Sequence, residues 1–200
     1  MTGMAIAPSH VRWFLSITFI LGLLVAPQAW LAGESQGAQA QAPAGAAIPG
    51  IRNFTKVDPT IACGGALALE AFPALKQAGY KSVVNLRGAD EPGANVEEHR
   101  RAAAAAGLTY IHLPFTYAAP DATKLDEFLK AVVKPENTPM MLHCASGNRV
   151  SVFWAVKRVM IDGWFLDKAM SELAALSMPF PPSLRTFMLD YLKSHGKGQQ

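Results

Sequence analysis

The segment His143-Cys144-Ala145-Ser146-Gly147-Asn148-Arg149 constrains the fold and the chemistry of this 200-residue chain more than any other. It follows the apolar run 139–142, which is typical of a buried strand, and precedes residues 150–163, whose apolar spacing predicts a helix. Cys144 is therefore expected at the carboxyl end of a strand, in a loop of small residues that opens a helix. Backbone N–H groups at such a position bind oxyanions and stabilise a thiolate. Arg149 can hold two oxygens of the same anion, so the segment predicts a thiolate nucleophile inside an anion-binding loop.

The amino-terminal part of the chain has the pattern of an export segment. Arg12 precedes an uncharged and mostly apolar run at residues 13–26, whose length suits a signal peptide better than a complete membrane span. Residues 1–32 are thus interpreted as a cleaved signal peptide, with an uncleaved transmembrane anchor as the alternative. Because no Lys or Arg follows Arg12 until Arg52, the positive-inside rule predicts that the bulk of the chain is exported to the periplasm or another extracytoplasmic space.

The composition divides the rest of the chain into a tether and a domain. Residues 33–50 consist largely of Ala, Gly, Gln and Pro, with Glu34 as their one charged residue, which predicts a flexible linker and a membrane tether if the anchor is retained. Residues 51–195 are numerous enough to bury a hydrophobic core of their own. The net charge of +3 is small and gives no reason to expect a nucleic-acid partner.

Apolar patterning within the domain alternates between strands and helices. Strands are expected at 81–86, 109–113 and 140–143, and helices at 95–106, 123–133, 149–162, 166–176 and 183–193. Such alternation predicts an α/β fold with a mostly parallel central sheet flanked by helices. Ligands in these sheets bind at the carboxyl ends of the strands, which is where Cys144 and Arg87 are expected.

Two parts of the domain resemble known phosphatases. Residues 143–149 resemble the signature of cysteine-dependent phosphatases of the dual-specificity and tyrosine type. Residues 79–87 (Gly-Tyr-Lys-Ser-Val-Val-Asn-Leu-Arg) and 106–114 (Ala-Gly-Leu-Thr-Tyr-Ile-His-Leu-Pro) are similar to the phosphatase-like domain family of beta-lactamase hydrolase-like proteins. Together these similarities cover about residues 65–155, most of the expected domain.

This resemblance implies a phosphatase-like α/β fold with a cysteine nucleophile. On matching positions Cys144 would attack the substrate and Arg149 would hold its anionic group. The substrate would also be bound by the backbone amides of the loop, which comprises Ala145, Ser146, Gly147 and Asn148.

The spacing of the loop departs from the phosphatase signature, which has five residues between Cys and Arg. Here there are four, Ala145 to Asn148, a length that resembles the loop of rhodanese-type sulfurtransferases. The substrate is therefore expected to be a phosphorylated or a sulfur-bearing anion. Three hypotheses follow: a cysteine-dependent phosphatase, a sulfurtransferase that carries a persulfide on Cys144, and an anion-binding module without turnover.

A phosphatase also needs a general acid near the leaving oxygen. Asp121 is the best candidate by position, with capping of the helix at 123–133 as its alternative role; Asp90 and Glu91 are weaker candidates. Arg87 is a candidate substrate-binding residue from a neighbouring strand end.

The second cysteine and the histidines indicate less about function. Cys63, the second of two cysteines, is expected to be a small buried residue, and a regulatory disulfide with Cys144 is the alternative. No Cys/His spacing indicates a metal site, and no glycine-rich motif indicates a nucleotide cofactor.

Overall fold

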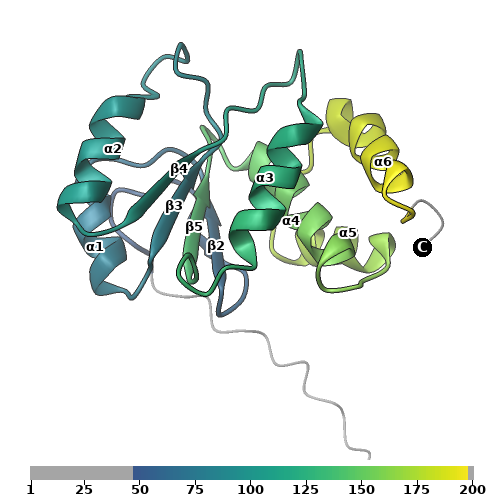
Figure 1. Ribbon diagram of the computed structural model, residues 1–200, viewed down its shortest axis with the longest axis horizontal. Helices are drawn as coiled ribbons and strands as arrows, with labels where there is room; N and C mark the ends of the chain where they lie inside the picture. Colours follow the sequence, from purple (N-terminus) through teal and green to yellow (C-terminus); the bar gives the residue numbers. More distant parts are fainter. Residues whose placement is uncertain (1–46, 198–200) are drawn as a thin grey trace, which may run out of the picture. The chain divides into compact units, whose positions relative to one another are not determined.

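A computed structural model describes residues 47–197 of the chain (Figure 1). The strands are β1 (Thr55–Lys56), β2 (Ile61–Gly64), β3 (Ser82–Asn85), β4 (Thr109–His112) and β5 (Met140–His143). The helices are α1 (Ala71–Gln77), α2 (Val96–Ala105), α3 (Ala122–Val132), α4 (Asn148–Met160), α5 (Leu166–Ala175) and α6 (Arg185–Ser194), with a 3₁₀ turn η1 (Pro182–Leu184). The expected signal peptide or anchor and most of the expected linker lie outside the described residues.

The five strands form one sheet in the order β1-β2-β5-β3-β4. Strand β2 pairs in parallel with β5, β5 with β3, and β3 with β4, whereas β1 runs antiparallel to β2 at the edge. Helices α1 and α2 cover one face of the sheet and α3 to α6 the other (Figure 1). The prediction of an α/β fold with a mostly parallel, helix-flanked sheet is confirmed.

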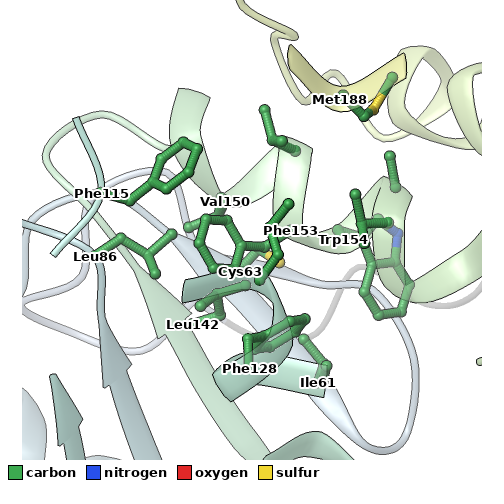
Figure 2. Close-up of a cluster of buried hydrophobic side chains, with 14 of the residues drawn as sticks. Ile61, Cys63, Leu86, Phe115, Phe128, Leu142, Val150, Phe153, Trp154 and Met188 are labelled. Carbon is green, nitrogen blue, oxygen red and sulfur yellow. The ribbon is translucent and has the colours of Figure 1, made fainter. Parts of the chain in front are cut away.

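Each face of the sheet has its own hydrophobic core. The face under α1 and α2 packs Phe72, Leu75, Val83 and Met141, and Ile48 also joins this cluster. The other core is larger and includes Leu142, Phe153, Phe128 and Trp154 (Figure 2). Ile48 precedes the predicted start of the domain at residue 51, and the Gly50 carbonyl oxygen accepts the Ala68 N–H at 2.8 Å.

Helix α4 lies at the centre of the larger core and is buried nearly all round, including its basic residues. Arg158 stacks on Trp154 and Trp164, with its Cζ 4.1 and 4.2 Å from the two ring centroids. Its guanidinium also donates to both carboxylate oxygens of Glu172 on α5, at 2.8 and 2.6 Å. The paired charges and stacking allow a basic residue to be buried here.

Within residues 47–197, none of the helices has both the length and the apolar character needed to cross a bilayer.

Candidate active site

The loop from Cys144 to Arg149, called the cradle from here on, connects β5 to α4. The Cys144 N–H donates to the carbonyl oxygen of Gly64 at 3.3 Å and so extends the β2–β5 pairing by one residue. Gly147 has a φ of +103° and precedes the first helical residue, Asn148. A side chain at Gly147 would meet no atom within 4 Å, so the backbone angle and not the available space favours glycine there.

The outer side of the cradle is bonded to the segment that follows β2 and to the segment that precedes β1. The carbonyl oxygen of Ala145 accepts the Ala66 N–H at 3.0 Å, and that of Ser146 accepts the Asn53 side-chain amide at 2.9 Å. In a trans peptide the C=O and the following N–H point in opposite directions. The N–H groups of Ser146 and Gly147 therefore point inward, and the Gly147 N–H indeed donates to the Cys144 Sγ at 3.2 Å.

Gly65 explains how the segment after β2 can approach so closely. A Cβ at this position would lie 3.0 Å from the Ala145 carbonyl oxygen and 3.2 Å from the carbonyl oxygen of Arg52. Both neighbours are backbone atoms that cannot rotate away, so a larger residue would push the cradle outward.

Arg149 lies beside Cys144 and is held along one edge of its guanidinium. Its Nη2 donates to Glu91 Oε2 at 2.8 Å and its Nη1 contacts Glu91 Oε1, which makes a bidentate pair. The same Nη1 donates to the carbonyl oxygens of Phe115 at 3.0 Å and Leu86 at 3.3 Å. Burial alone would lower the pKa of Arg149, but the Glu91 carboxylate and the nearby Cys144 raise it. The guanidinium is therefore a fixed cation adjacent to the sulfur.

Cys144 itself has no exposed surface and belongs to the larger core. Its sulfur is nevertheless placed between a backbone donor and Arg149 and does not lie in hydrocarbon alone. The structure thus brings together Cys144, the Gly147 N–H and Arg149, and their catalytic roles stay predictions.

The Glu91 side chain is held by its own loop as well as by Arg149. The Gly88 N–H donates to Glu91 Oε1 at 2.8 Å. Hydrogen bonding with Arg149 lowers the pKa of Glu91 to about 2. Glu91 is thus a carboxylate at neutral pH, and its position suits holding Arg149 better than donating a proton, the role for which the sequence made it a weak candidate.

Arg87 contacts the loop that carries Glu91. Its Nη1 and Nη2 donate to the carbonyl oxygens of Gly93 at 2.7 Å and Pro92 at 2.6 Å, and its Nε lies 3.5 Å from Glu91 Oε2. The side chain is buried, and these bonds occupy the guanidinium. The expected contact of Arg87 with substrate stays a prediction; the contacts present indicate that it positions Glu91, and Glu91 in turn holds Arg149.

Arg87→Gln is expected to lower the affinity for tungstate, an inorganic oxyanion, by about 10-fold, because Glu91 would no longer be fixed against Arg149. If Arg87 acts through Glu91, the same change should cost much less in a Glu91→Gln background, and calorimetric titration of the four proteins measures this coupling. Arg100→Gln is the control, since Arg100 pairs with Glu97 on the surface of α2. If the losses of tungstate affinity from the two substitutions were additive, Arg87 would not act through Glu91.

Asp121 occupies the amino-terminal cap of α3. Its Oδ1 accepts the Thr123 N–H at 2.9 Å and the Thr123 hydroxyl at 2.8 Å. These two hydrogen bonds lower the pKa of Asp121. The carboxylate is therefore ionised at neutral pH, which favours the capping role over that of a general acid.

Two further polar side chains near the cradle are engaged elsewhere or buried. The Ser151 hydroxyl lies 2.6 Å from the Asn148 carbonyl oxygen and 2.8 Å from that of Pro179, so its one proton is used. Cys63 and Cys144 are both free thiols. Cys63 pairs in register with Leu142, two residues before Cys144, so a disulfide between them would have to bridge a diagonal pair.

His143 lies on the opposite face of the sheet from the Cys144 side chain. Both ring nitrogens lack hydrogen-bond partners among residues 47–197, and its ring centroid lies 5.9 Å from that of the buried His99. Burial, followed by the proximity of His99, lowers the pKa of His143 to about 3. His143 is therefore neutral at physiological pH and supplies no positive charge to the thiolate.

The buried histidine predicts acid sensitivity of the fold. Since the unfolded state binds a proton near pH 6.5 and the folded state only near pH 3, the free energy of unfolding should fall as the pH drops through this range, by up to a few kcal/mol. Urea denaturation at pH 7.5, 5.5 and 4.5 measures the slope. His143→Leu should flatten this dependence of stability on pH, whereas His195→Gln, at the end of α6, should not. If the free energy of unfolding fell equally with pH in wild type and His143→Leu, His143 would not be the cause of the acid sensitivity.

Glu91 and Tyr117 are the residues near the cradle whose roles were not expected. Both lie on loops that leave the carboxyl edge of the sheet, after β3 and β4 respectively (Figure 1). The Tyr117 ring centroid lies 5.8 Å from the Arg149 Cζ. The topology of the sheet places these loops beside the cradle, and a sequence pattern could have indicated only that they follow strands.

Comparisons with known proteins agree with the fold described above. Residues 53–161 match the family described as beta-lactamase hydrolase-like protein, phosphatase-like domain. TpbA from P. aeruginosa is 21% identical with a TM-score of 0.58, over 78% of this chain and 96% of that one. The catalytic domain of the PP-IP phosphatase SIW14 from S. cerevisiae is 18% identical with a TM-score of 0.57, over 76% and 92%. No match was found among curated proteins.

Proposed function

Because the chain belongs to the phosphatase-like domain family of the beta-lactamase hydrolase-like proteins, we propose that it is a cysteine-dependent phosphatase acting on phosphomonoesters. The observation that carries this proposal is the position of the Cys144 sulfur, between the inward Gly147 N–H and the Arg149 guanidinium. A thiolate held among such donors can act as a nucleophile, and the same donors form an oxyanion-binding site next to it.

In the first step the Cys144 thiolate attacks phosphorus, an S–P bond forms and the bond from phosphorus to the leaving oxygen breaks. The cradle amides and Arg149 bind the equatorial oxygens, on which negative charge is held in the transition state. Glu91 fixes one edge of the guanidinium, which leaves the other edge for the substrate. Water then cleaves the cysteinyl-phosphate. Since Cys144 has no exposed surface, side chains around the sulfur must move aside before a phosphoryl group can reach it.

The substrate class rests on relatives of the same fold. One solved structure contains a TpbA variant in complex with phosphotyrosine; it is 24% identical with a TM-score of 0.52, over 66% of this chain and 78% of that one. This complex supports a phosphorylated substrate for the present chain.

The alternative of sulfur transfer is favoured by the four-residue spacing of the cradle. One set of assays on the full-length chain under reducing conditions separates the hypotheses. Phosphate release from p-nitrophenyl phosphate is expected, and thiocyanate formation from thiosulfate and cyanide is not. The reverse result would establish the sulfurtransferase, and no turnover together with stabilisation by tungstate would leave an anion-binding module.

We further propose that the protein acts outside the cytoplasm, on the basis of the apolar run at 13–26 and the absence of basic residues between Arg12 and Arg52. Alkaline phosphatase fused to the carboxyl end of the full chain should be active, because this reporter folds only after export. Extraction of membranes with alkaline carbonate then distinguishes a retained anchor from a cleaved signal peptide.

A further inference from the structure

The proposed phosphatase reaction needs a proton for the leaving oxygen, and the carboxylic acids near the cradle are poorly suited to supply it. Glu91 is bound by Arg149 through both carboxylate oxygens. Asp121 uses its Oδ1 to cap α3. Both are ionised at neutral pH for the reasons given above, so neither carries a proton into the reaction.

Tyr117 is a further proton donor, and it lies beside the Arg149 guanidinium. Tyr117 is 43% exposed, whereas Cys144 and Arg149 of the cradle are buried. Its ring lies over the Arg149 guanidinium at 5.8 Å, and its hydroxyl makes no hydrogen bond to another residue of the described part of the chain. A residue that is exposed beside the buried Cys144 and Arg149 can extend toward a leaving group that points to solvent.

The loop that carries Tyr117 is fixed on the cradle by its backbone. Two residues earlier, the Phe115 N–H donates to the Leu86 carbonyl oxygen at 3.1 Å, and the Phe115 carbonyl oxygen accepts from Arg149 at 3.0 Å. Just after Tyr117, the Ala119 N–H donates to the Thr116 hydroxyl oxygen at 3.2 Å. Tyr117 therefore lies in a short turn whose start is bonded to the anion-binding arginine itself.

We propose that the Tyr117 hydroxyl is the general acid of this site. This inference rests on the proposed phosphatase function and adds the residue that protonates the leaving group. As the bond from phosphorus breaks, its electron pair stays on the leaving oxygen, which takes the Tyr117 proton. The resulting tyrosinate then accepts a proton from the water that attacks the cysteinyl-phosphate, so that the site returns to its starting state.

The electrostatic surroundings keep this hydroxyl protonated. Burial raises the pKa of Tyr117, and among the charged groups that face it Cys144 and Glu91 raise the pKa further while Arg149 lowers it. A phenol with a raised pKa keeps its proton throughout the neutral pH range. Turnover of an ester with a poor leaving group should therefore not decline between pH 6 and pH 8.5, where an enzyme that uses a carboxylic acid loses its proton donor.

The test compares wild type, Tyr117→Phe and Tyr117→Ala on two substrates, phenyl phosphate and 2,4-dinitrophenyl phosphate. Only the first has a leaving group that needs protonation. Tyr117→Phe keeps the ring over Arg149 and should lower kcat for phenyl phosphate by about 100-fold, with little change for the dinitrophenyl ester. A role in packing alone would instead spare the Phe variant and reduce both substrates equally in the Ala variant.

The outcomes separate this inference from the proposed function. Equal kcat of wild type and Tyr117→Phe on phenyl phosphate would overturn the role of Tyr117 and leave the phosphatase intact. A wild-type protein without activity on the dinitrophenyl ester would overturn both.

Discussion

Cys144→Ser is expected to lower kcat for phosphate release by roughly 10⁴-fold or more, because the hydroxyl is far less ionised than the thiol it replaces. The cradle amides and Arg149 are unchanged in this variant, so tungstate should still bind and raise the melting temperature. Initial rates with p-nitrophenyl phosphate and thermal melts with and without tungstate measure the two properties. Loss of turnover with retained anion binding would identify Cys144 as the nucleophile.

Cys63→Ser is the matched control for this substitution. Cys63 is as buried as Cys144 and faces the same core (Figure 2), so serine should cost about 1–2 kcal/mol of stability there. Turnover should remain close to the wild-type value. A Cys144→Ser protein that keeps more than about a tenth of the wild-type rate would rule out the covalent mechanism.

Arg149→Lys is expected to lower kcat/KM by about 10² to 10³-fold, although the charge is kept. Lysine is a point charge and cannot hold Glu91 with one edge while presenting a second planar edge to the substrate. Tungstate affinity should fall in parallel, because the lost contacts are those to the anion. Steady-state kinetics and calorimetric titration report the two effects.

Arg158→Lys provides the comparison on the same helix. Arg158 also makes a bidentate pair, with Glu172, and is similarly buried, but it contacts α5 and not the cradle. The substitution should lower the melting temperature and leave KM and tungstate affinity unchanged. If both lysine variants lost stability and neither lost tungstate affinity, Arg149 would be a structural residue only.

The sequence indicated some elements of the site clearly and others not at all. The apolar run 139–142, the small residues that follow His143 and Cys144, and the periodic segment after them define a strand, a loop and a helix by local rules alone. Cys144 and Arg149 belong to this one segment, so their meeting required no knowledge of the rest of the chain. Strand β2, which has four residues and includes Gly64, has too little periodicity to be recognised and was not expected.

Contacts between distant segments decided the roles of the charged residues. Glu91 and Arg149 are 58 positions apart and meet because β3 and β5 are neighbours in the sheet. Arg87 was a candidate substrate ligand from its strand-end position; its guanidinium donates to carbonyl oxygens of its own loop, and contact with substrate stays a prediction. A strand-end position predicts that a side chain is near the ligand-binding edge of the sheet, but it does not predict which acceptors lie closest to that side chain.

The sequence by itself determined the α/β class, the mostly parallel sheet and the position of Cys144 in a loop between a strand and a helix, since each depends on apolar periodicity or on residues close together in the chain. The cap made by Asp121 on Thr123 is also a local contact, one of the two roles that the sequence allowed for this residue. Only the tertiary structure decided which carboxylate holds Arg149 and that Tyr117 lies beside its guanidinium, because these contacts depend on which loops the strand order brings side by side.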